Sequence, residues 1–165
     1  MSFEKITHLF FDMGNTLMEF HRGISDEEKN RLGTERVAAY LSLRSQKPIS
    51  FDEVWHGFVQ PWMTVMPKRK LFSIEYPIEN YLLPFLEKHQ LNTQKETLVE
   101  IMKLVDSEYQ KHLFIEPDTI PLIAALKGVG LKIGVIANSC NYDEVNIGHF
   151  KAVGLDPYID FYNFS

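Results

Sequence analysis

The chain has 165 residues, of which 45% are hydrophobic and 24% charged, so it can bury a core and form one domain with, at most, a small additional lobe. Its net charge of -5 argues against a nucleic-acid backbone and against an anionic membrane surface as the partner. A single cysteine excludes an internal disulfide framework, and no apolar run is long enough to span a bilayer. Since the first residues also lack a signal-peptide pattern, we expect a cytoplasmic protein.

An apolar run at residues 6–11 predicts the first strand. It stops at Asp12 and is followed by turn-forming residues, which is typical of a fully buried strand. Ligands of open parallel sheets bind beyond the carboxyl ends of the strands, where Asp12 would lie. A carboxylate there can hold a cation, or attack phosphorus and carry the phosphoryl group. The alternative is an Asx turn, in which Asp12 only bonds amides of its own turn.

The sequence from residue 25 to residue 114 predicts a series of helices. Capping boxes predict three of the helix starts, at Ser25 with Glu28, Ser50 with Glu53 and Thr93 with Glu96. Pro61 is expected to kink or end the second of these helices, because its ring clashes with the preceding turn. Gly33 is expected to weaken the middle of the first.

Strands and helices alternate in the last part of the chain. Residues 119–128 predict a helix, and the apolar run 131–137 predicts a second buried strand that ends in a polar turn. A helix at 143–153 and a strand-like run at 158–164 follow. Strands that alternate with helices imply an α/β fold with a parallel sheet and right-handed crossovers.

Two segments resemble motifs of the haloacid dehalogenase-like (HAD) hydrolases. In that family an apolar strand ends in Asp-x-Asp-x-Thr-Leu; Asp12, Thr16 and Leu17 match, whereas Gly14 replaces the second Asp and Asn15 the usual Gly. Residues 116–139 resemble the segment in which a helix ends in Gly and a strand leads to Ser/Thr-Asn. The resemblance covers the whole chain and implies a parallel Rossmann-like (HAD-like) core, incomplete at the C-terminus, at residues 1–20 and 116–165. Residues 21–115 would be an inserted α-helical cap.

The resemblance implies a hydrolase of the phosphatase, phosphonatase or dehalogenase type. Asp12 would attack the substrate, most simply a small phosphorylated metabolite, and form an aspartyl intermediate. Mg²⁺ would be held by Asp12 and the backbone carbonyl of Gly14. Gly14, Asn15, Asn138 and Ser139 would bind the phosphate, mainly through backbone amides.

Three departures from the family pattern lead us to expect an inactive 165-residue form. Gly14 lacks the carboxylate that protonates the leaving group, and general acid catalysis is typically worth ~10²–10⁴ in rate. Ala137 stands where the family has Ser or Thr. The family's Lys and its acidic metal-binding pair would lie beyond Ser165. The alternative to an enzyme is a catalytically dead HAD-like binding or interaction module.

For several other residues a functional role can be weighed against a purely structural one. Arg22, after His21, could reach an anion, or the pair could form a solvated linker into the cap. Trp55 and Trp62 lie seven residues apart, which favours core packing over a ligand stack. A nucleophilic cysteine needs a group that stabilises its thiolate, and the sequence pattern does not identify one for Cys140, so we interpret Cys140 as structural.

The resemblance also implies a sheet order of first, second and third strand. Residues 6–11 would then form an apolar edge without proline. Such an edge is a template for pairing with another chain, so we expect self-association through the exposed first strand.

Overall fold

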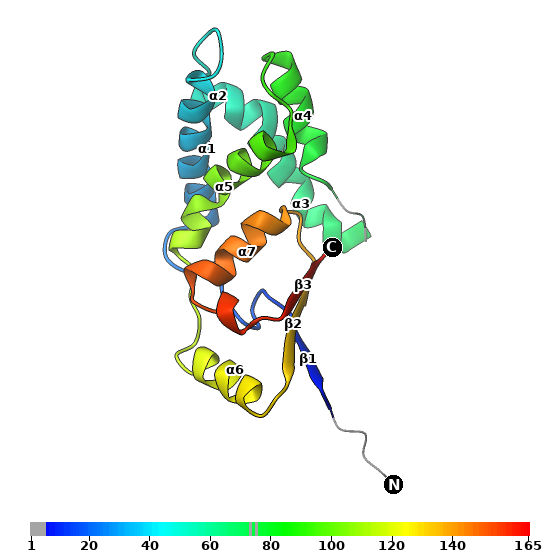
Figure 1. Ribbon diagram of the computed structural model, residues 1–165. Helices are drawn as coiled ribbons and strands as arrows, with labels where there is room; N and C mark the ends of the chain where they lie inside the picture. The colour runs from blue at the N-terminus through cyan, green and yellow to red at the C-terminus, as the bar shows by residue number, and fades with distance from the viewer. Residues whose placement is uncertain (1–5, 73, 75) are drawn as a thin grey trace.

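The structure is a computed structural model that describes residues 6–72, 74 and 76–165 (Figure 1). The first five residues of the predicted core therefore lie outside the described part. The elements in chain order are β1 (His8–Phe11), α1 (Asp26–Ser42), α2 (Phe51–Val54), the π-helical turn η1 (Trp55–Val59), α3 (Gln60–Phe72), α4 (Glu79–Lys88), α5 (Lys95–Lys111), α6 (Thr119–Gly128), β2 (Lys132–Ala137), α7 (Asp143–Ala152), the 3₁₀ turn η2 (Asp156–Tyr158) and β3 (Phe161–Phe164).

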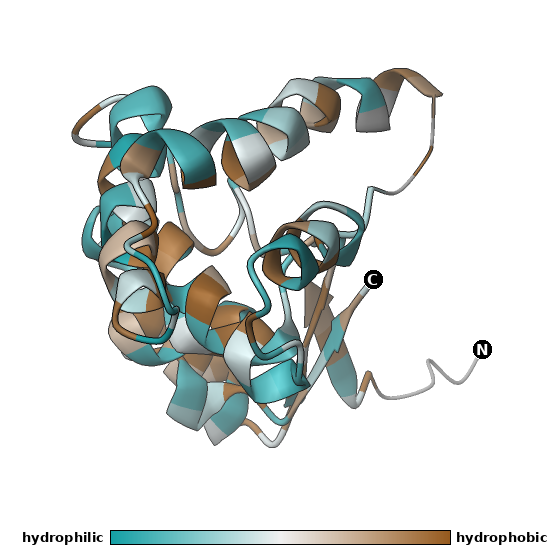
Figure 2. Ribbon diagram, turned by 90° about the horizontal axis from the view of Figure 1, so that it is seen from above, coloured by the Kyte–Doolittle hydropathy of each residue, from teal (hydrophilic) through white to brown (hydrophobic). Residues whose placement is uncertain are grey.

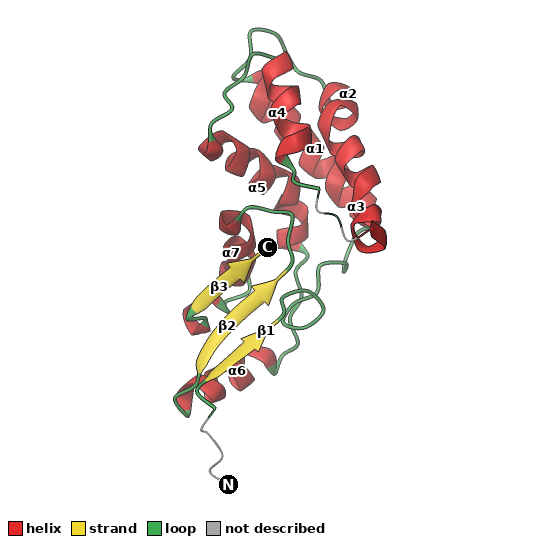
Figure 3. Ribbon diagram, turned by 90° about the vertical axis from the view of Figure 1, so that its right-hand side faces the viewer, coloured by secondary structure: helices red, strands yellow, loops and turns green. Residues whose placement is uncertain are grey.

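The sheet is parallel, and its order is β1-β2-β3. This confirms the predicted α/β class and the predicted strand order. Leu9 pairs with Ile133, and Val135 pairs with Tyr162. All three strands run toward the helices of the inserted segment, so their carboxyl ends face that segment (Figure 3). Asp12 and Asn138, which follow β1 and β2, are therefore placed at the same edge of the sheet.

The prediction that the first strand is fully buried is wrong. Along β1 half-buried residues alternate with exposed ones, and Phe10 is 54% exposed. In the described part of the chain α6 and α7 cover one face of the sheet, and β1 has a strand neighbour only in β2 (Figure 3). Leu9 and Phe11 point to the covered face, whereas His8 and Phe10 point away from it.

The core beneath the sheet is formed by strand residues together with residues of α6 and α7. Ile133 and Val135 of β2 are completely buried, as are Ile123 of α6 and Phe150 of α7. Phe150 also meets the ring of Tyr162 edge-on, with centroids 5.0 Å apart. Most helices mix hydrophobic and hydrophilic residues along their length, as expected for helices with one buried side (Figure 2).

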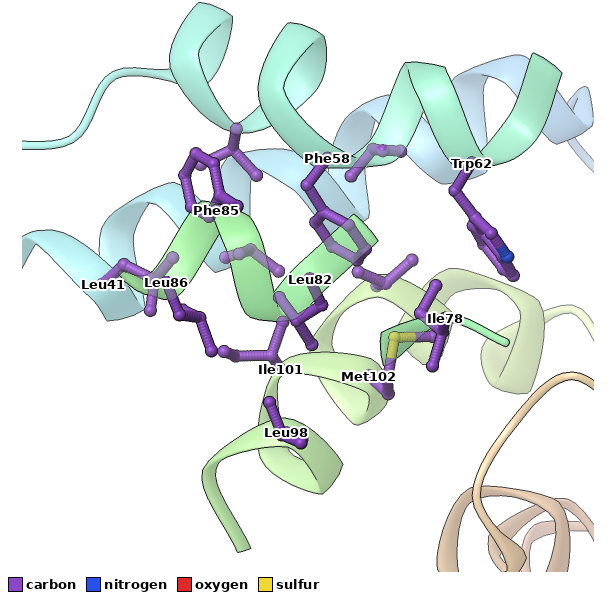
Figure 4. Packing of buried hydrophobic residues seen from close by; sticks show 14 of the residues in the cluster. Leu41, Phe58, Trp62, Ile78, Leu82, Phe85, Leu86, Leu98, Ile101 and Met102 are labelled. Atoms are coloured by element: carbon purple, nitrogen blue, oxygen red, sulfur yellow. The ribbon is translucent and has the colours of Figure 1, made fainter. Parts of the chain in front are cut away.

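The inserted segment has its own hydrophobic cluster, and we call α1 to α5 the cap. Figure 4 shows the cluster's side chains converging from α1, α3, α4 and α5. Leu82, Phe58 and Ile101 are fully buried in it. Gly33 of α1 lies so close to α5 that a Cβ atom there would meet the backbone carbonyl of Val105. The glycine that lowers helix propensity is thus the residue that lets α1 and α5 approach each other.

Two of the three predicted capping boxes form helix starts. Ser25 Oγ accepts a hydrogen bond from the Glu28 amide at 3.2 Å, and Ser50 and Glu53 make both bonds of a capping box. The third prediction is wrong. Helix α5 begins after Gln94, whose side chain makes no capping bond, and the Asn92 side chain instead accepts a bond from the Gln94 amide.

Pro61 does not end the helix, so that part of the prediction for Pro61 is wrong; a kink at Pro61 stays a prediction. The chain continues from α2 through η1 into α3, and Pro61 lies in the first turn of α3. A π-helical turn directly before a proline absorbs the lost N–H bond and the steric clash of the ring. The apolar stripe thereby continues to Trp62, which reaches the edge of the cap cluster (Figure 4).

The predicted boundaries of the cap, residues 21 and 115, remain a prediction. Glu19 and Phe114 form an isolated bridge in which each amide donates to the other residue's carbonyl, at 2.8 and 3.1 Å. The two connections between core and cap therefore run side by side. The cap is also docked on α7, because Val145 belongs to the cap cluster and Lys95 pairs with Glu144 at 2.8 Å.

No helix within the described ranges is both long and apolar enough to cross a membrane.

We expect the chain of residues 1–165 to self-associate, as the sequence predicted. Phe10 and Ile136 (46% exposed) lie on the same uncovered face of the sheet, and the Phe161 ring packs against Phe10 with centroids 5.1 Å apart. An unpaired edge beside an apolar face is a template for a second copy. Sedimentation velocity at micromolar concentration should show dimers or larger species.

Phe10→Lys should shift the distribution toward monomer, because it places a charge in the middle of the edge strand. Leu122→Lys is the matched control, since Leu122 is 56% exposed on α6, outside the sheet edge. A wild-type chain that sediments only as monomer would contradict the prediction.

Candidate functional site

The turn after β1 is held by backbone bonds that place Asp12 at the sheet edge. The carbonyl of Met13 accepts bonds from the amides of Leu17 and Met18, at 3.0 and 3.1 Å. Asn15 adopts a positive φ of 57°, and its amide donates to the Met18 carbonyl at 2.8 Å. This left-handed conformation favours glycine and is tolerated by asparagine, which explains physically how Asn15 can stand where the resemblance expects Gly.

The turn after β2 is held by side chains. The Ser139 hydroxyl donates to Asn146 Oδ1 at 2.9 Å and accepts a bond from the Asn141 amide at 3.2 Å. Asn146 on α7 is completely buried, so it fixes this turn to the core. The Ser139 amide donates to the carbonyl of Ser165 at 2.8 Å.

A cavity of about 490 Å³, which we call the Asp12 cavity, lies at the ends of β1 and β2. Of the predicted site residues, Asp12, Gly14 and Asn138 line it. Ser139 lines a neighbouring cavity instead, and Asn15 lies in the turn. The amides of Asn15 and Ser139 are already hydrogen-bonded, so a phosphate would compete for them with Met18 and Ser165. The assignment of these residues to phosphate binding remains a prediction.

The neighbouring cavity, of about 500 Å³, lies between the cap and the core, and we call it the cap cavity. It shares Met13, Phe20 and Asn138 with the Asp12 cavity, so the two adjoin. The cap contributes Trp62 and Met66 from α3 and Met102 and Tyr109 from α5. A ligand that reaches Asp12 could therefore extend beneath the cap.

Asp106 of α5 and His149 of α7 form a buried pair across the wall of the cap cavity. The Asp106 carboxylate is hydrogen-bonded to Nε2 of His149, a residue that is 1% exposed. Burial raises the pKa of Asp106, and the bond to His149 partly opposes that rise. Nδ1 of His149 is buried and has no hydrogen-bond partner among the described residues.

Tyr109 supplies a neutral hydroxyl to the same wall. Its oxygen accepts a bond from Asn30 Nδ2 at 3.1 Å. Burial raises the pKa of Tyr109 to about 12, so the phenol stays protonated at neutral pH. The hydroxyl can donate to a ligand without adding charge.

The predicted magnesium ligands are oxygen donors of the kind that Mg²⁺ prefers. Asp12 offers a carboxylate and Gly14 a backbone carbonyl beside the same cavity. The described residues contain no cluster of three or more His, Cys, Asp or Glu that could hold a metal. Two protein oxygens are a small number of protein ligands for Mg²⁺, which usually completes its coordination shell with waters and substrate phosphate.

The other residues considered from sequence have distinct surroundings. His21 lines the cap cavity, whereas Arg22 donates to Glu19 at 2.6 Å and stacks on Phe114, 3.6 Å from the ring centroid. Cys140 also lines the cap cavity. Trp62 was assigned to core packing by its helical spacing, and it belongs to the cap cluster, but it lines the cap cavity as well.

Sequence reasoning missed the pair of Asp106 and His149. The two residues are 43 positions apart, on helices that only the docking of cap on core brings together. The available signal was the position of Asp106, directly after Val105 and three before Tyr109, on the edge of an apolar helical stripe. The position of Asp106 in the sequence does not indicate that its partner is His149.

No family model matches the sequence, and no curated protein matches it. Among solved structures, a HAD phosphatase from Thermococcus onnurineus matches with 20% identity and a TM-score of 0.48, covering 96% of this chain and 62% of that chain. L-2-haloacid dehalogenase from Xanthobacter autotrophicus, with chloropropionic acid covalently bound, matches with 15% identity, a TM-score of 0.43 and coverage of 97% and 57%. YfnB from Bacillus subtilis, described as a HAD hydrolase and bound to magnesium, matches with 13% identity, a TM-score of 0.48 and coverage of 98% and 64%. The chain is thus similar to solved HAD hydrolases, and it spans less than two thirds of the length of each.

Proposed function

We propose that the protein is a HAD-like hydrolase that acts on a small anionic metabolite in the cytoplasm, through a covalent intermediate on Asp12. The observation that carries the proposal is the position of Asp12, exposed at the carboxyl end of β1 and lining a cavity with Gly14 and Asn138. Asp12, Thr16 and Leu17 match the HAD pattern in type and spacing, whereas Gly14 and Asn15 depart from it.

In the proposed reaction the Asp12 carboxylate attacks the phosphorus atom of a phosphorylated substrate. A P–O bond forms to Asp12 while the bond to the leaving group breaks, and water then hydrolyses the acyl phosphate to inorganic phosphate. Splitting one displacement into two easier steps is the advantage of covalent catalysis. Mg²⁺ held by Asp12 and the Gly14 carbonyl would offset negative charge on the transferring group.

Gly14 decides which substrates suit the site. A phosphate ester needs a proton donor for its leaving alcohol, and Gly14 has no side chain that could supply one. Substrates whose leaving group departs without protonation, such as a halide or a stabilised carbanion, avoid this requirement. The site would therefore also allow attack by Asp12 on a substrate of this kind, as an alternative to phosphate-ester hydrolysis.

The test is to trap the intermediate. The protein in its native length is mixed with phenyl phosphate and Mg²⁺, quenched in acid and analysed by peptide mass spectrometry. We expect a phosphorylated peptide that contains Asp12 and loses its modification on treatment with hydroxylamine, as acyl phosphates do. If a chloroalkanoic acid labels Asp12 where phenyl phosphate does not, the reaction is attack by Asp12 with loss of a halide rather than phosphoryl transfer. Labelling at another residue, or none with either reagent, would overturn the proposal.

A second candidate function is a catalytically dead binding module. It is favoured by the lack of a carboxylate at Gly14 and by the small number of protein oxygens available to a metal. The two functions differ in their dependence on Asp12. Binding of a ligand or protein partner that is unchanged by Asp12→Asn, together with absence of turnover, would identify the module.

A further inference from the structure

The cap cavity has a strongly apolar wall on its cap side. Trp62, Met63 and Met66 of α3 face Met102 and Val105 of α5 across it. Methionine side chains adapt to the shape of a bound group, and cavities of about 300–1,000 Å³ with such linings hold small organic molecules. At about 500 Å³ the cap cavity suits a compact body such as one substituted ring.

The charges on the wall do not favour a second anionic group. The described side chains that line the cavity include the carboxylates of Asp26 and Asp106 but no lysine or arginine. Asp26 is paired with His21 at 2.7 Å and with Lys29 at 3.3 Å, and Asp106 is paired with His149. A ligand carboxylate or phosphate here would lie beside two acidic side chains, with no lysine or arginine among the described residues of the wall.

Three buried polar atoms of residues that line the cavity lack hydrogen-bond partners within the described residues: Nε1 of Trp62, Oδ1 of Asn141 and Nδ1 of His149. Trp62 is 8% exposed, and its indole N–H can only donate. His149 Nδ1 accepts when Nε2–H donates to Asp106, and it donates when Asp106 holds the proton. A hydroxyl both donates and accepts, so it is a small uncharged group that can accept from Trp62, donate to Asn141 or pair with either form of His149.

We propose that the cap cavity binds the non-reacting part of the substrate, and that this part is a compact, uncharged, mainly apolar group carrying a hydroxyl that accepts the Trp62 N–H. The assignment rests on the proposed function, because the reacting anionic end would lie in the adjoining Asp12 cavity.

The test uses two probes that differ by one hydroxyl, para-cresol and toluene. The chain has two tryptophans, and Trp55 is stacked on Phe51 outside the cap cavity. In Trp55→Phe the emission of Trp62 alone reports binding. We expect para-cresol to change this emission and to bind about five- to tenfold more tightly than toluene, the gain of one hydrogen bond.

Trp62→Phe keeps an aromatic ring but removes the N–H donor, and Trp55→Phe is its matched control. Calorimetry should show that the advantage of para-cresol over toluene falls to less than about twofold in Trp62→Phe and is retained in Trp55→Phe. Equal affinities of the two probes for the wild type would overturn the proposal. An unchanged advantage of para-cresol in Trp62→Phe would also overturn it. A third probe, methylenediphosphonate, is a small anion without an apolar body; a larger change in Trp62 emission with this probe than with para-cresol would overturn the proposal as well.

A fourth probe separates this inference from the proposed function. With Mg²⁺ present, para-hydroxybenzylphosphonate extends the cresol body by an anionic group that can reach the Asp12 cavity. Tighter binding than para-cresol supports both assignments. If the phosphonate adds no affinity while para-cresol still binds better than toluene, the anion site of the proposed function is wrong and the assignment of the cap cavity stands.

Discussion

Replacing Asp12 by asparagine should abolish turnover, with a fall in kcat on the order of 10³-fold or more, because an amide cannot form the acyl intermediate. Asp12 is exposed at the end of β1, so the change of one oxygen to nitrogen should leave the fold intact. The substrate should still bind, since the apolar wall of the cap cavity is unchanged. The measurement is steady-state hydrolysis in the presence of Mg²⁺ by the protein in its native length, at substrate concentrations above and below KM.

The matched control for this experiment is Asp118→Asn. Asp118 is also exposed and makes no capping bond with its side chain, but it lies before α6, outside the lining of both cavities. We expect activity within about twofold of wild type in this variant, as is usual for surface substitutions that remove no specific contact. If Asp12→Asn keeps the turnover of the control, Asp12 is not the nucleophile, and the proposed reaction is wrong.

Gly33→Ala should be the most destabilising single-methyl change in the cap. The new Cβ would meet the backbone carbonyl of Val105, which cannot rotate aside as a side chain could. Overpacking typically costs 1–3 kcal/mol, and a backbone obstacle puts this variant at about 3 kcal/mol. The higher helix propensity of alanine offsets about 1 kcal/mol of this cost, so we expect the free energy of unfolding to fall by about 2 kcal/mol.

Gly128→Ala is the control, since a Cβ there would meet nothing within 4 Å and the residue also lies in a helix. It should be neutral or stabilised by up to about 1 kcal/mol, because only the helix propensity changes. Urea denaturation of both variants gives the comparison. Equal stability of Gly33→Ala and wild type would mean that α1 and α5 are farther apart than described.

Local patterns in the sequence were enough to place most elements. Helix α6 has the predicted bounds, and the caps at Ser25 and Ser50 form as their spacing indicated. These features depend on residues three or four positions apart, which the sequence shows directly. The expectation that Pro61 could end the helix is wrong, because an uncommon π-helical turn continues the helix past the proline.

Features that depend on distant residues could not be obtained in this way. The apolar run before Asp12 has the pattern of a buried strand, yet Phe10 is exposed, because burial depends on whether another element covers each face of the sheet.

The prediction of a capping box at Thr93 is wrong for a local reason. The Asn92 side chain bonds the Gln94 amide, and the helix begins one residue later than the pattern predicted.

The sequence alone determined the α/β class and the position of Asp12 at a strand end, because hydrophobic periods and turn residues are local features of the chain. The strand order was implied only by the resemblance to HAD hydrolases. Only the tertiary structure decided what surrounds Asp12. The cap cavity is formed by side chains of α1, α3, α5, α7 and two turns, and the pair of Asp106 and His149 joins residues 43 positions apart. Such contacts follow from how helices pack against each other, and the packing of the cap on α7 is set by many weak contacts at once, none of which has a sequence pattern of its own.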